Sequence, residues 1–402
     1  MKKQLLNLML LTASIVVIQS ATAQTCDGQR YYSKIFTGST VSTVTYTDVN
    51  VTTQAMDIYQ PTGDAATNRK AVLLIHGGSF YAGSKTDAFI VYMCQELAKR
   101  GYVTASINYR LVPFTSLLDL YDSTSAYPHV LQSMGDAKAA VRYLKKNATS
   151  LNIDSNWIVI GGESAGAIIG NHVAYVKTLA ECSPLLRSDF AGIGGLEGNS
   201  GNPGYSTKVK AVLNWAGSLL SLGMITADDH EPLYSAHGDH DNTVPYLCGQ
   251  VLGGQSNITT CGSGAMKPAF DALSIPNQLH TFQGADHVPW ETSATDKDTV
   301  EKETALFLYK LDCPAFTNIN DIANDVAVSL YPNPASKQIT IKTDATVETI
   351  QVIDNIGRVV LNHTATGMQS HIDIAALSGG IYVAKIMLKD NKGMAMKSFV
   401  VE

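Results

Sequence analysis

The segment with the clearest chemical signal is a serine held between two glycines. The run Gly162-Glu163-Ser164-Ala165-Gly166 has the G-x-S-x-G pattern, and it lies between the apolar run WIVIG and the helix-forming run AIIGNHVAYV. A serine at a sharp strand-to-helix turn is exposed as a nucleophile, and flanking glycines let neighbouring backbone approach it. The pentapeptide alone also occurs by chance in turns, so its place between a predicted strand and a predicted helix carries the inference. We predict that Ser164 is a catalytic nucleophile.

A serine hydroxyl needs a base, and the base needs a carboxylate that holds its tautomer and stabilises its charged form. His287, in FQGADHVPW, follows the last predicted strand and precedes the final predicted helix. Asp241, in SAHGDHDNTVPY, follows the strand before it, which gives the chain order serine, acid, histidine. Asp239 is better placed to shape the turn, and Asp286 cannot readily turn back onto the ring of its neighbour. We therefore predict a triad of Ser164, Asp241 and His287.

The cluster of His237, Asp239, His240 and Asp241 has a second interpretation as a metal site, because imidazole and carboxylate are good zinc ligands. Four such groups within five residues rarely converge on one tetrahedral ion. A metal site would also leave the serine motif unexplained. We expect no metal ion and no cofactor.

A second glycine-containing loop, His76-Gly77-Gly78-Ser79, directly follows the apolar run AVLLI. Glycines there allow backbone N–H groups to point at the charge that develops on a tetrahedral intermediate, which contributes roughly 2.7–4 kcal/mol per donor. We assign the oxyanion hole to the N–H groups of Gly78, Ser79 and Ala165. We expect His76 to hold this loop in place and not to act as a base.

The elements that must position these residues alternate between strand and helix. Residues 31–59 are rich in β-branched residues and predict two antiparallel edge strands. After them, apolar strand-like runs alternate with helical patterns at about 88–100, at GDAKAAVRYLKKN, after Ser164 and at about 299–311. This repetition predicts an α/β fold with a mostly parallel eight-stranded sheet and helices on both faces. We expect a loop at 112–128 to border the active site, and the glycine-rich 185–206 to form either a second bordering loop or a rudimentary lid.

The character of the chain changes after Cys313. PAFTNINDIANDV is typical of a linker, and from Val326 onward only short alternating strands separated by turns are found. We expect a small immunoglobulin-like β-sandwich of about seven strands there. The domains predicted are a signal peptide at 1–23, a catalytic domain at 24–313, a linker at 314–325 and the β-sandwich at 326–402.

The N-terminal residues predict export. Lys2 and Lys3 precede an apolar stretch from Leu5 to Ile18, and the small-residue pattern of residues 21–23 follows. The stretch is shorter than the ~20 residues of a spanning helix, which argues against a membrane anchor, and no later segment is long and apolar enough to span. Charged residues make up 16% of the chain and the net charge is −6, so no basic surface favours nucleic acid.

An exported chain meets oxidising conditions, in which cysteines pair. Six cysteines allow 15 pairings, and the sequence does not choose among them; the short Cys248 to Cys261 loop is the most economical guess. Cys94, on a predicted helix, also fits a buried free thiol. The six are Cys26, Cys94, Cys182, Cys248, Cys261 and Cys313.

The segment from about Cys26 to Cys313 resembles the α/β-hydrolase superfamily, especially compact carboxylesterases with an HGG-type oxyanion loop. AVLLIHGGSF, NYRLVP, DAKAAVRYL, GGESAG, HGDHDNTVP and GADH stand in the expected order. Two positions depart from the pattern: Ser79 stands where a third glycine is common, and Glu163 where the lipase-like branch commonly has aspartate. The resemblance implies a secreted serine carboxylic-ester hydrolase that works through an acyl-enzyme.

Two alternatives stay open beside this interpretation. Relatives of the same fold cleave peptides, although no gating domain precedes the catalytic region here, and some serve in adhesion after their triad has decayed. The natural acyl and alcohol groups are not readable from the sequence, because loops assemble the pocket.

The C-terminal part, with LYPNPA at 330–335, GGIYVAKI and KSFVVE, is similar to the sorting domain of type IX secretion systems. This similarity implies the secretion machinery as a partner and a destination at the cell surface or in the medium. A carbohydrate-binding or adhesive β-sandwich is the competing interpretation, but it offers few aromatic residues for stacking on sugars.

Overall fold

The computed structural model describes residue 26 and residues 28–47, 53–314, 328–354, 358–365, 367–389 and 394–402. It divides into two compact units, Met1–Pro314 and Ala315–Glu402, and each is described by itself. The expected signal peptide at 1–23, and the expected linker apart from Pro314, lie outside the described residues and stay predictions.

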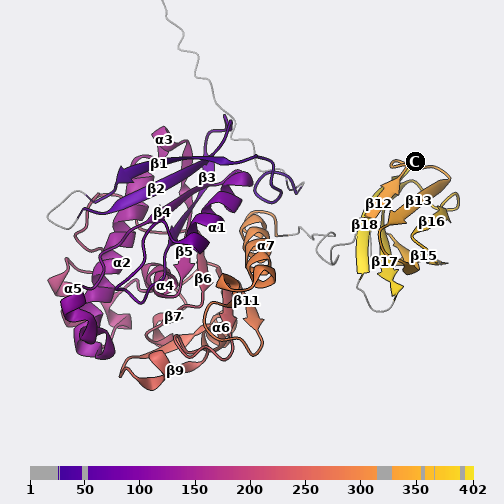
Figure 1. The fold of residues 1–402 in the computed structure, drawn as a ribbon. Helices are drawn as coiled ribbons and strands as arrows, with labels where there is room; N and C mark the ends of the chain where they lie inside the picture. The colour runs from indigo at the N-terminus through magenta and orange to yellow at the C-terminus, as the bar shows by residue number, and fades with distance from the viewer. Residues whose placement is uncertain are drawn as a thin grey trace, which may run out of the picture. The chain divides into compact units, whose positions relative to one another are not determined.

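The first unit is built on an eight-stranded sheet with the order β1-β2-β4-β3-β5-β6-β8-β11 (Figure 1). β1 and β2 pair antiparallel at one edge, β2 pairs antiparallel with β4, and the remaining neighbours are all parallel. This confirms the predicted, mostly parallel eight-stranded sheet. The strands are β1 Ser39–Thr45, β2 Ala55–Pro61, β3 Arg69–Ile75, β4 Val103–Ile107, β5 Ile153–Glu163, β6 Val212–Trp215, β8 Leu233–Gly238 and β11 Asn277–Phe282.

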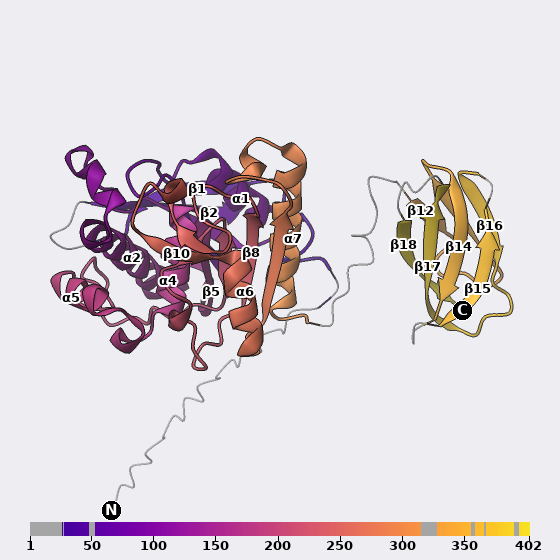
Figure 2. The ribbon, with the colours of Figure 1, turned by 90° about the horizontal axis from the view of Figure 1, so that it is seen from below.

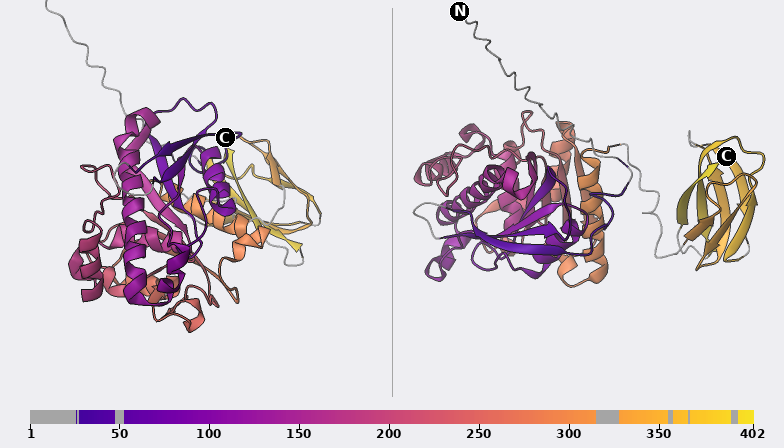
Figure 3. Two further views of the ribbon diagram at one scale, coloured as in Figure 1. Left: turned by 60° about the vertical axis from the view of Figure 1, so that its left-hand side comes forward. Right: turned by 90° about the horizontal axis from the view of Figure 1, so that it is seen from above.

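Helices cover both faces of this sheet, as predicted (Figure 2). The helices α1 and α7 lie together on one face, and the long α2 runs along the other beside α4 (Figure 3). α6 packs against the end of α4 through the rings of Tyr175 and Phe270, whose centroids are 5.0 Å apart. The helices are α1 Ala88–Lys99, α2 Ser123–Lys146, α3 Ala148–Leu151, α4 Ala165–Tyr175, α5 Pro184–Gly192, α6 Ser263–Ala272 and α7 Ala294–Lys310.

Five short 3₁₀ helices occur within the described residues: η1 Phe114–Tyr121, η2 Leu179–Glu181, η3 Leu222–Met224, η4 Leu252–Gly254 and η5 Pro289–Glu291. None of the helices in this described part has the length and apolar composition that crossing a membrane requires.

The expectation of a loop over 112–128 was wrong. Residues Phe114–Tyr121 form η1, and α2 already begins at Ser123, capped by the Asp122 side chain, which accepts from Thr124 N. Pro128, the last residue of the expected loop, lies in the second turn of α2, where proline removes one main-chain hydrogen bond near the helix end.

The glycine-rich stretch at 185–206 also differs from the predicted loop. Its first part belongs to α5, and its second part is held against α2 by buried polar side chains. Arg142 donates to the carbonyls of Glu197 and Gly201, each at 2.9 Å, and Ser200 donates to Asp136 at 2.6 Å.

A three-stranded hairpin sheet, with the order β7-β10-β9, lies outside the central sheet; its strands are β7 Ser218–Leu219, β9 Cys248–Gln250 and β10 Thr259–Gly262. Cys248 and Cys261 are register partners in β9 and β10 and form a disulfide, which confirms the economical guess. A second disulfide joins Cys26 to Cys313. The remaining two cysteines, Cys94 and Cys182, are buried free thiols.

The second unit contains two antiparallel sheets, with the orders β12-β13-β16 and β15-β14-β17-β18. Their inward-facing residues, among them Ile339, Ile350, Ile386 and Phe399, form one buried cluster. The predicted small all-β sandwich of about seven strands is confirmed for the described residues. The strands are β12 Val328–Tyr331, β13 Gln338–Thr343, β14 Val347–Ile353, β15 Val359–Thr364, β16 Gln369–Asp373, β17 Gly380–Leu388 and β18 Met394–Val401.

Candidate active site

Ser164 lies at the turn between β5 and α4, in a backbone conformation that few residues other than glycine adopt. Its φ and ψ are 53° and −119°, and its N–H donates to Trp215 O at 2.8 Å. A Cβ atom on Gly162 or Gly166 would lie 2.2 or 2.1 Å from the carbonyl oxygen of Ile75 in β3. The G-x-S-x-G spacing is therefore required because β3 approaches the turn so closely.

The three residues of the predicted triad meet at the carboxyl ends of β5, β8 and β11. His287 Nε2 is 2.9 Å from Ser164 Oγ, and His287 Nδ1 is 2.6 Å from Asp241 Oδ2. Parallel strands bring their carboxyl ends to one edge of a sheet, so loops far apart in the chain converge there. Assigned by its partners, the imidazole donates from Nδ1 to the carboxylate and accepts from the serine hydroxyl at Nε2.

The Asp241 carboxylate is fixed by four donors. Oδ1 accepts from the N–H groups of Thr243 and Val244, both at 2.8 Å, and Oδ2 accepts from His287 and from His237 Nε2 at 3.1 Å. Burial alone would raise the pKa of Asp241, but the hydrogen bonds from His237 and His287 hold it well below its usual range. Asp241 is therefore ionised and aligned for the imidazole.

His237 has a role that sequence reasoning missed. The sequence suggested only a metal-ligand role for it. In the structure it is fully buried, and while its Nε2 contacts Asp241, its Nδ1 lies 2.8 Å from Ser263 Oγ. His237 therefore helps to fix the orientation of the Asp241 carboxylate from the side of the core. Its place in the cluster before Asp241 was visible, but Ser263 is 26 residues further on, so no local pattern indicated this contact.

The four residues of the possible metal cluster separate into two pairs. His240 Nδ1 and Asp239 Oδ1 pair with each other at the surface, 2.7 Å apart, while His237 and Asp241 face the interior. Asp239 also accepts from Gly284 N at 2.6 Å, which fits the turn-shaping role expected of it. The donor atoms therefore do not converge on one ion.

Asp286, beside His287, joins the acid loop to the histidine loop. Its Oδ1 accepts from Asn242 N at 2.9 Å and from His287 N at 2.8 Å. As expected, its carboxylate caps backbone groups and does not contact the neighbouring ring.

The predicted oxyanion residues come from two elements. Gly78 and Ser79 have φ values of 103° and 50° in the loop after β3, and Ala165 opens α4, where first-turn N–H groups have no acceptor within the helix. Ser79 and Ala165 line the same cavity as Ser164, whereas Gly78 is not among its lining residues.

His76 anchors this loop. Its ring stacks on Tyr109 with centroids 4.4 Å apart, and its Nδ1 lies 2.6 Å from Gly77 O. Burial lowers the pKa of His76, so the side chain is neutral, which suits a structural role.

An apolar cavity of about 230 Å³ opens beside Ser164. Every side chain that lines it is uncharged, and none comes from 185–206, so the expectation that this segment borders the pocket was wrong. The lining residues are Ser79, Phe80, Tyr81, Leu117, Leu120, Tyr121, Ala126, Tyr127, Val130, Ser164, Ala165, Ile168, Leu220, Thr243, Val244, Val251, Leu252, Ile258 and Thr260.

The cavity wall is made by two elements that are fastened to each other. One is η1 with the start of α2, and the other is the disulfide-linked β9–β10 hairpin. Asn257 of the hairpin donates its N–H to Tyr121 O at 3.1 Å and its amide to Asp122 Oδ2 at 2.7 Å. Its amide oxygen accepts from Ser123 N at 2.7 Å.

Comparisons with known proteins find two family matches. Residues 56–227 match the family model BD-FAE, and residues 329–402 match the Secretion system C-terminal sorting domain. The first match contains the predicted oxyanion loop and Ser164 and ends before Asp241 and His287.

The relatives and solved structures that this chain is similar to include several esterases. Para-nitrobenzyl esterase of Bacillus subtilis is 33% identical over 102 residues, a match that covers 25% of this chain and only 20% of that enzyme. Esterase 2 of Thermogutta terrifontis, phosphorylated by paraoxon, has a TM-score of 0.50 at 20% identity and covers 69% of this chain and 95% of its own. A truncated carbohydrate esterase from gut microbiota has a TM-score of 0.50 at 19% identity, with 70% and 98% covered. At these identities the structural likeness shows the fold alone.

The first unit has an α/β-hydrolase fold. Within that fold class, residues 56–227 are similar to BD-FAE domains, and residues 329–402 are similar to secretion system sorting domains. The sorting domain marks the protein for type IX secretion to the cell surface or the medium.

Proposed function

We propose that the protein is a secreted carboxylic-ester hydrolase in which Ser164 is the nucleophile, His287 the general base and Asp241 the residue that orients it. The observation that carries the proposal is the imidazole of His287, which bridges Ser164 Oγ at 2.9 Å and Asp241 Oδ2 at 2.6 Å. A nucleophile, a base and an orienting group within hydrogen-bond reach of one another form the arrangement that acyl transfer needs.

The reaction proceeds in two steps. His287 Nε2 takes the proton of Ser164 Oγ as the oxygen attacks the ester carbonyl, and the Asp241 carboxylate stabilises the imidazolium. The N–H groups of Ser79 and Ala165, with Gly78, stabilise the negative charge on the carbonyl oxygen. The imidazolium then protonates the departing alcohol and leaves an acyl-enzyme on Ser164. Water, deprotonated by the same imidazole, releases the acid and restores the serine.

The cavity supports uncharged substrates. Its aromatic and aliphatic lining has no charged side chain, and a carboxylate or ammonium group would lose its hydration there without a partner. The names of the esterases that this chain resembles support ester substrates as well. The chain matches only a fifth of para-nitrobenzyl esterase, so which esters it hydrolyses is part of the proposal.

The second unit supplies the proposed partner. A C-terminal sorting domain supports recognition by the type IX secretion machinery after passage through the periplasm. The mature hydrolase would then meet its substrates outside the cell.

A p-nitrophenyl ester series from acetate to dodecanoate tests the proposal. Purified wild-type protein should hydrolyse the short and medium esters, and Ser164→Ala should lower kcat by roughly 10⁴-fold or more, because the nucleophile is absent. Equal activity in the variant, or no hydrolysis of any ester by the wild type, would contradict the proposal. The second result would turn attention to peptide substrates or a binding role.

A further inference from the structure

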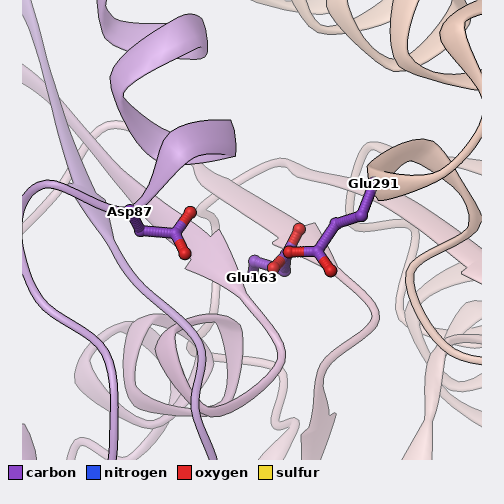
Figure 4. Close-up of side chains that lie close together, drawn as sticks. All are labelled: Asp87, Glu163 and Glu291. Carbon is purple, nitrogen blue, oxygen red and sulfur yellow. The ribbon is translucent and has the colours of Figure 1, made fainter.

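Three carboxyl groups meet beside the nucleophile turn, and none of them lines the cavity. Glu163 is the last residue of β5, Asp87 caps the N-terminus of α1, and Glu291 ends η5. Their carboxyl oxygens lie within 4.8 Å of one another, and Figure 4 shows Asp87 and Glu291 approaching Glu163 from opposite sides. None of the catalytic steps above uses this cluster.

Glu163 is the buried member. It is 4% exposed, whereas Glu291 is at the surface. The indole Nε1 of Trp290 donates to Glu163 Oε2 at 2.5 Å, and the fully buried Trp290 ring packs beside Phe89 and Phe282, with centroids 5.9 and 5.7 Å away. Trp290 therefore holds the Glu163 carboxyl in one place.

Among the described residues, no cationic side chain forms a hydrogen bond or ion pair with this carboxyl. Asp87 Oδ1 already accepts from the N–H groups of Phe89 and Ile90 at 3.1 and 3.2 Å. Two titratable groups interact electrostatically with Asp87: His76 of the oxyanion loop and Tyr109 of the segment after β4. His76 is neutral through burial, and the same burial raises the pKa of Tyr109, so neither offsets the negative charges.

A buried carboxyl beside two other carboxyls is disfavoured in its charged form. Burial raises the pKa of Glu163 well above its usual range, and the charges of Glu291 and Asp87 add to the rise, while the Trp290 N–H offsets only part of it. A protonated carboxyl can accept from Trp290 with one oxygen and donate to Glu291 with the other.

We propose that Glu163 is a positioning residue whose neutral carboxyl ties the nucleophile turn to the segment that carries the catalytic histidine. It precedes Ser164 directly, and its two partners, Trp290 and Glu291, follow His287 by three and four residues. This bridge fixes the distance between Ser164 and His287. The inference rests on the proposed function, because only that function requires the two side chains to stay in contact. Ionisation of Glu163 would set it against Glu291 and loosen the bridge.

Activity measurements on Glu163 variants test whether its neutral carboxyl positions the catalytic residues or only fills space in the core. Glu163→Ala should lower kcat for p-nitrophenyl butyrate at least tenfold with KM changed less than threefold, because alignment and not substrate binding is lost. Glu163→Gln, which keeps one acceptor and one donor, should recover at least a third of the wild-type kcat and extend activity to more alkaline pH. If Glu163→Gln falls as far as Glu163→Ala, the proposal is overturned.

Should Glu163→Ala not fold, Trp290→Phe is the second variant. It keeps the packed ring and removes the N–H, so kcat should fall several-fold with KM unchanged. A wild-type kcat in a folded Trp290→Phe protein would contradict the bridge.

Thermal unfolding of the full mature chain tests the protonation state without any enzyme activity, and so separates this inference from the proposed function. A carboxyl with a raised folded-state pKa contributes stability that is fully present below its unfolded value of ~4.3 and is lost as pH rises toward the folded value. The Tm of Glu163→Gln relative to wild type should therefore increase steadily from pH 5 upward.

Glu301→Gln is the matched control, because Glu301 is equally buried but paired with Arg100 and Lys34. Its Tm difference from wild type should stay flat above pH 5. A flat difference for Glu163→Gln as well would overturn the proposal.

A divalent cation is the competing occupant of three converging carboxylates. Wild-type Tm should not change by more than 1 °C, about the scatter of the measurement, on adding calcium, magnesium or EDTA. A calcium- or magnesium-dependent rise that disappears in Glu163→Gln would overturn the proposal and make the cluster a cation site.

Discussion

One oxygen atom of Asp241 receives hydrogen bonds from two histidines, His287 on the side of Ser164 and His237 on the side of the core. The other oxygen is occupied by two backbone N–H groups. The carboxylate can therefore neither rotate nor take up a proton easily, and this keeps the His287 tautomer that accepts from Ser164.

Replacing the Asp241 carboxylate by an amide tests its proposed role with a change of only one functional group. Asp241→Asn should lower kcat by about 10³- to 10⁴-fold, because an amide at that position favours the wrong imidazole tautomer. Asp239→Asn, in the same loop, is the matched control and should stay within about threefold of wild type. Steady-state kinetics with p-nitrophenyl butyrate measure both, and the reverse ranking would show that the acid was misassigned.

The convergence of Ser164, Asp241 and His287 was predictable because each lies within five residues after the end of a strand that the sequence predicts. The roles of His237 and Glu163 were not, because their partners come from distant segments. Ser263 is 26 residues from His237, and Trp290 is 127 residues from Glu163. Contacts of this kind depend on packing and leave no local spacing to recognise.

At the scale of elements, the β9–β10 hairpin and η1 together decide the shape of the cavity. The hairpin contributes Val251, Leu252, Ile258 and Thr260 to the lining, and Asn257 fastens it to η1. The Cys248–Cys261 disulfide closes the hairpin at its base.

Opening that disulfide should change which esters are hydrolysed. In the Cys248→Ser/Cys261→Ser double variant, kcat/KM for p-nitrophenyl octanoate should fall about tenfold, since the hairpin side chains no longer stay packed around the acyl chain. The value for acetate, which does not reach the hairpin, should stay within about threefold. An unchanged ratio between the two esters would show that the hairpin does not set chain-length preference.

The strands and helices of the sheet followed from their apolar runs, but the cavity wall did not. The expected loop at 112–128 forms η1 and the start of α2, and the glycine-rich 185–206, expected to border the active site, packs on α2 instead. Both outcomes were decided by contacts with other elements, such as the buried Arg142, and not by local propensity.

At the scale of the whole molecule, the Cys26–Cys313 disulfide joins the start of the described chain to the end of the first unit across 287 residues. Cross-linking so long a segment limits the unfolded chain, and its removal should cost about 3–5 kcal/mol of unfolding free energy. Thermal unfolding of Cys26→Ser/Cys313→Ser should show a lower Tm with an unchanged octanoate-to-acetate ratio. This variant is therefore also the control for the hairpin disulfide.

Because the chain divides into two compact units, we expect export and esterase activity to be separable. Deletion of residues 326–402 should abolish export from the native host while the purified first unit keeps its esterase activity, because its core and the proposed catalytic residues lie within Met1–Pro314. Fractionation of cells and medium, with activity assays on the purified proteins, measures both. Continued secretion of the shortened chain would contradict a sorting role for the second unit.

Covalent labelling can show whether Ser164 is the nucleophile and whether His287 activates it. Intact-mass measurement of protein treated with paraoxon should show a single phosphoryl adduct, and peptide mapping should locate it on Ser164. Ser164→Ala should stay unlabelled, and His287→Ala should react at least 100-fold more slowly because its serine keeps its proton. Labelling at another residue, or equal rates in wild type and His287→Ala, would contradict the account.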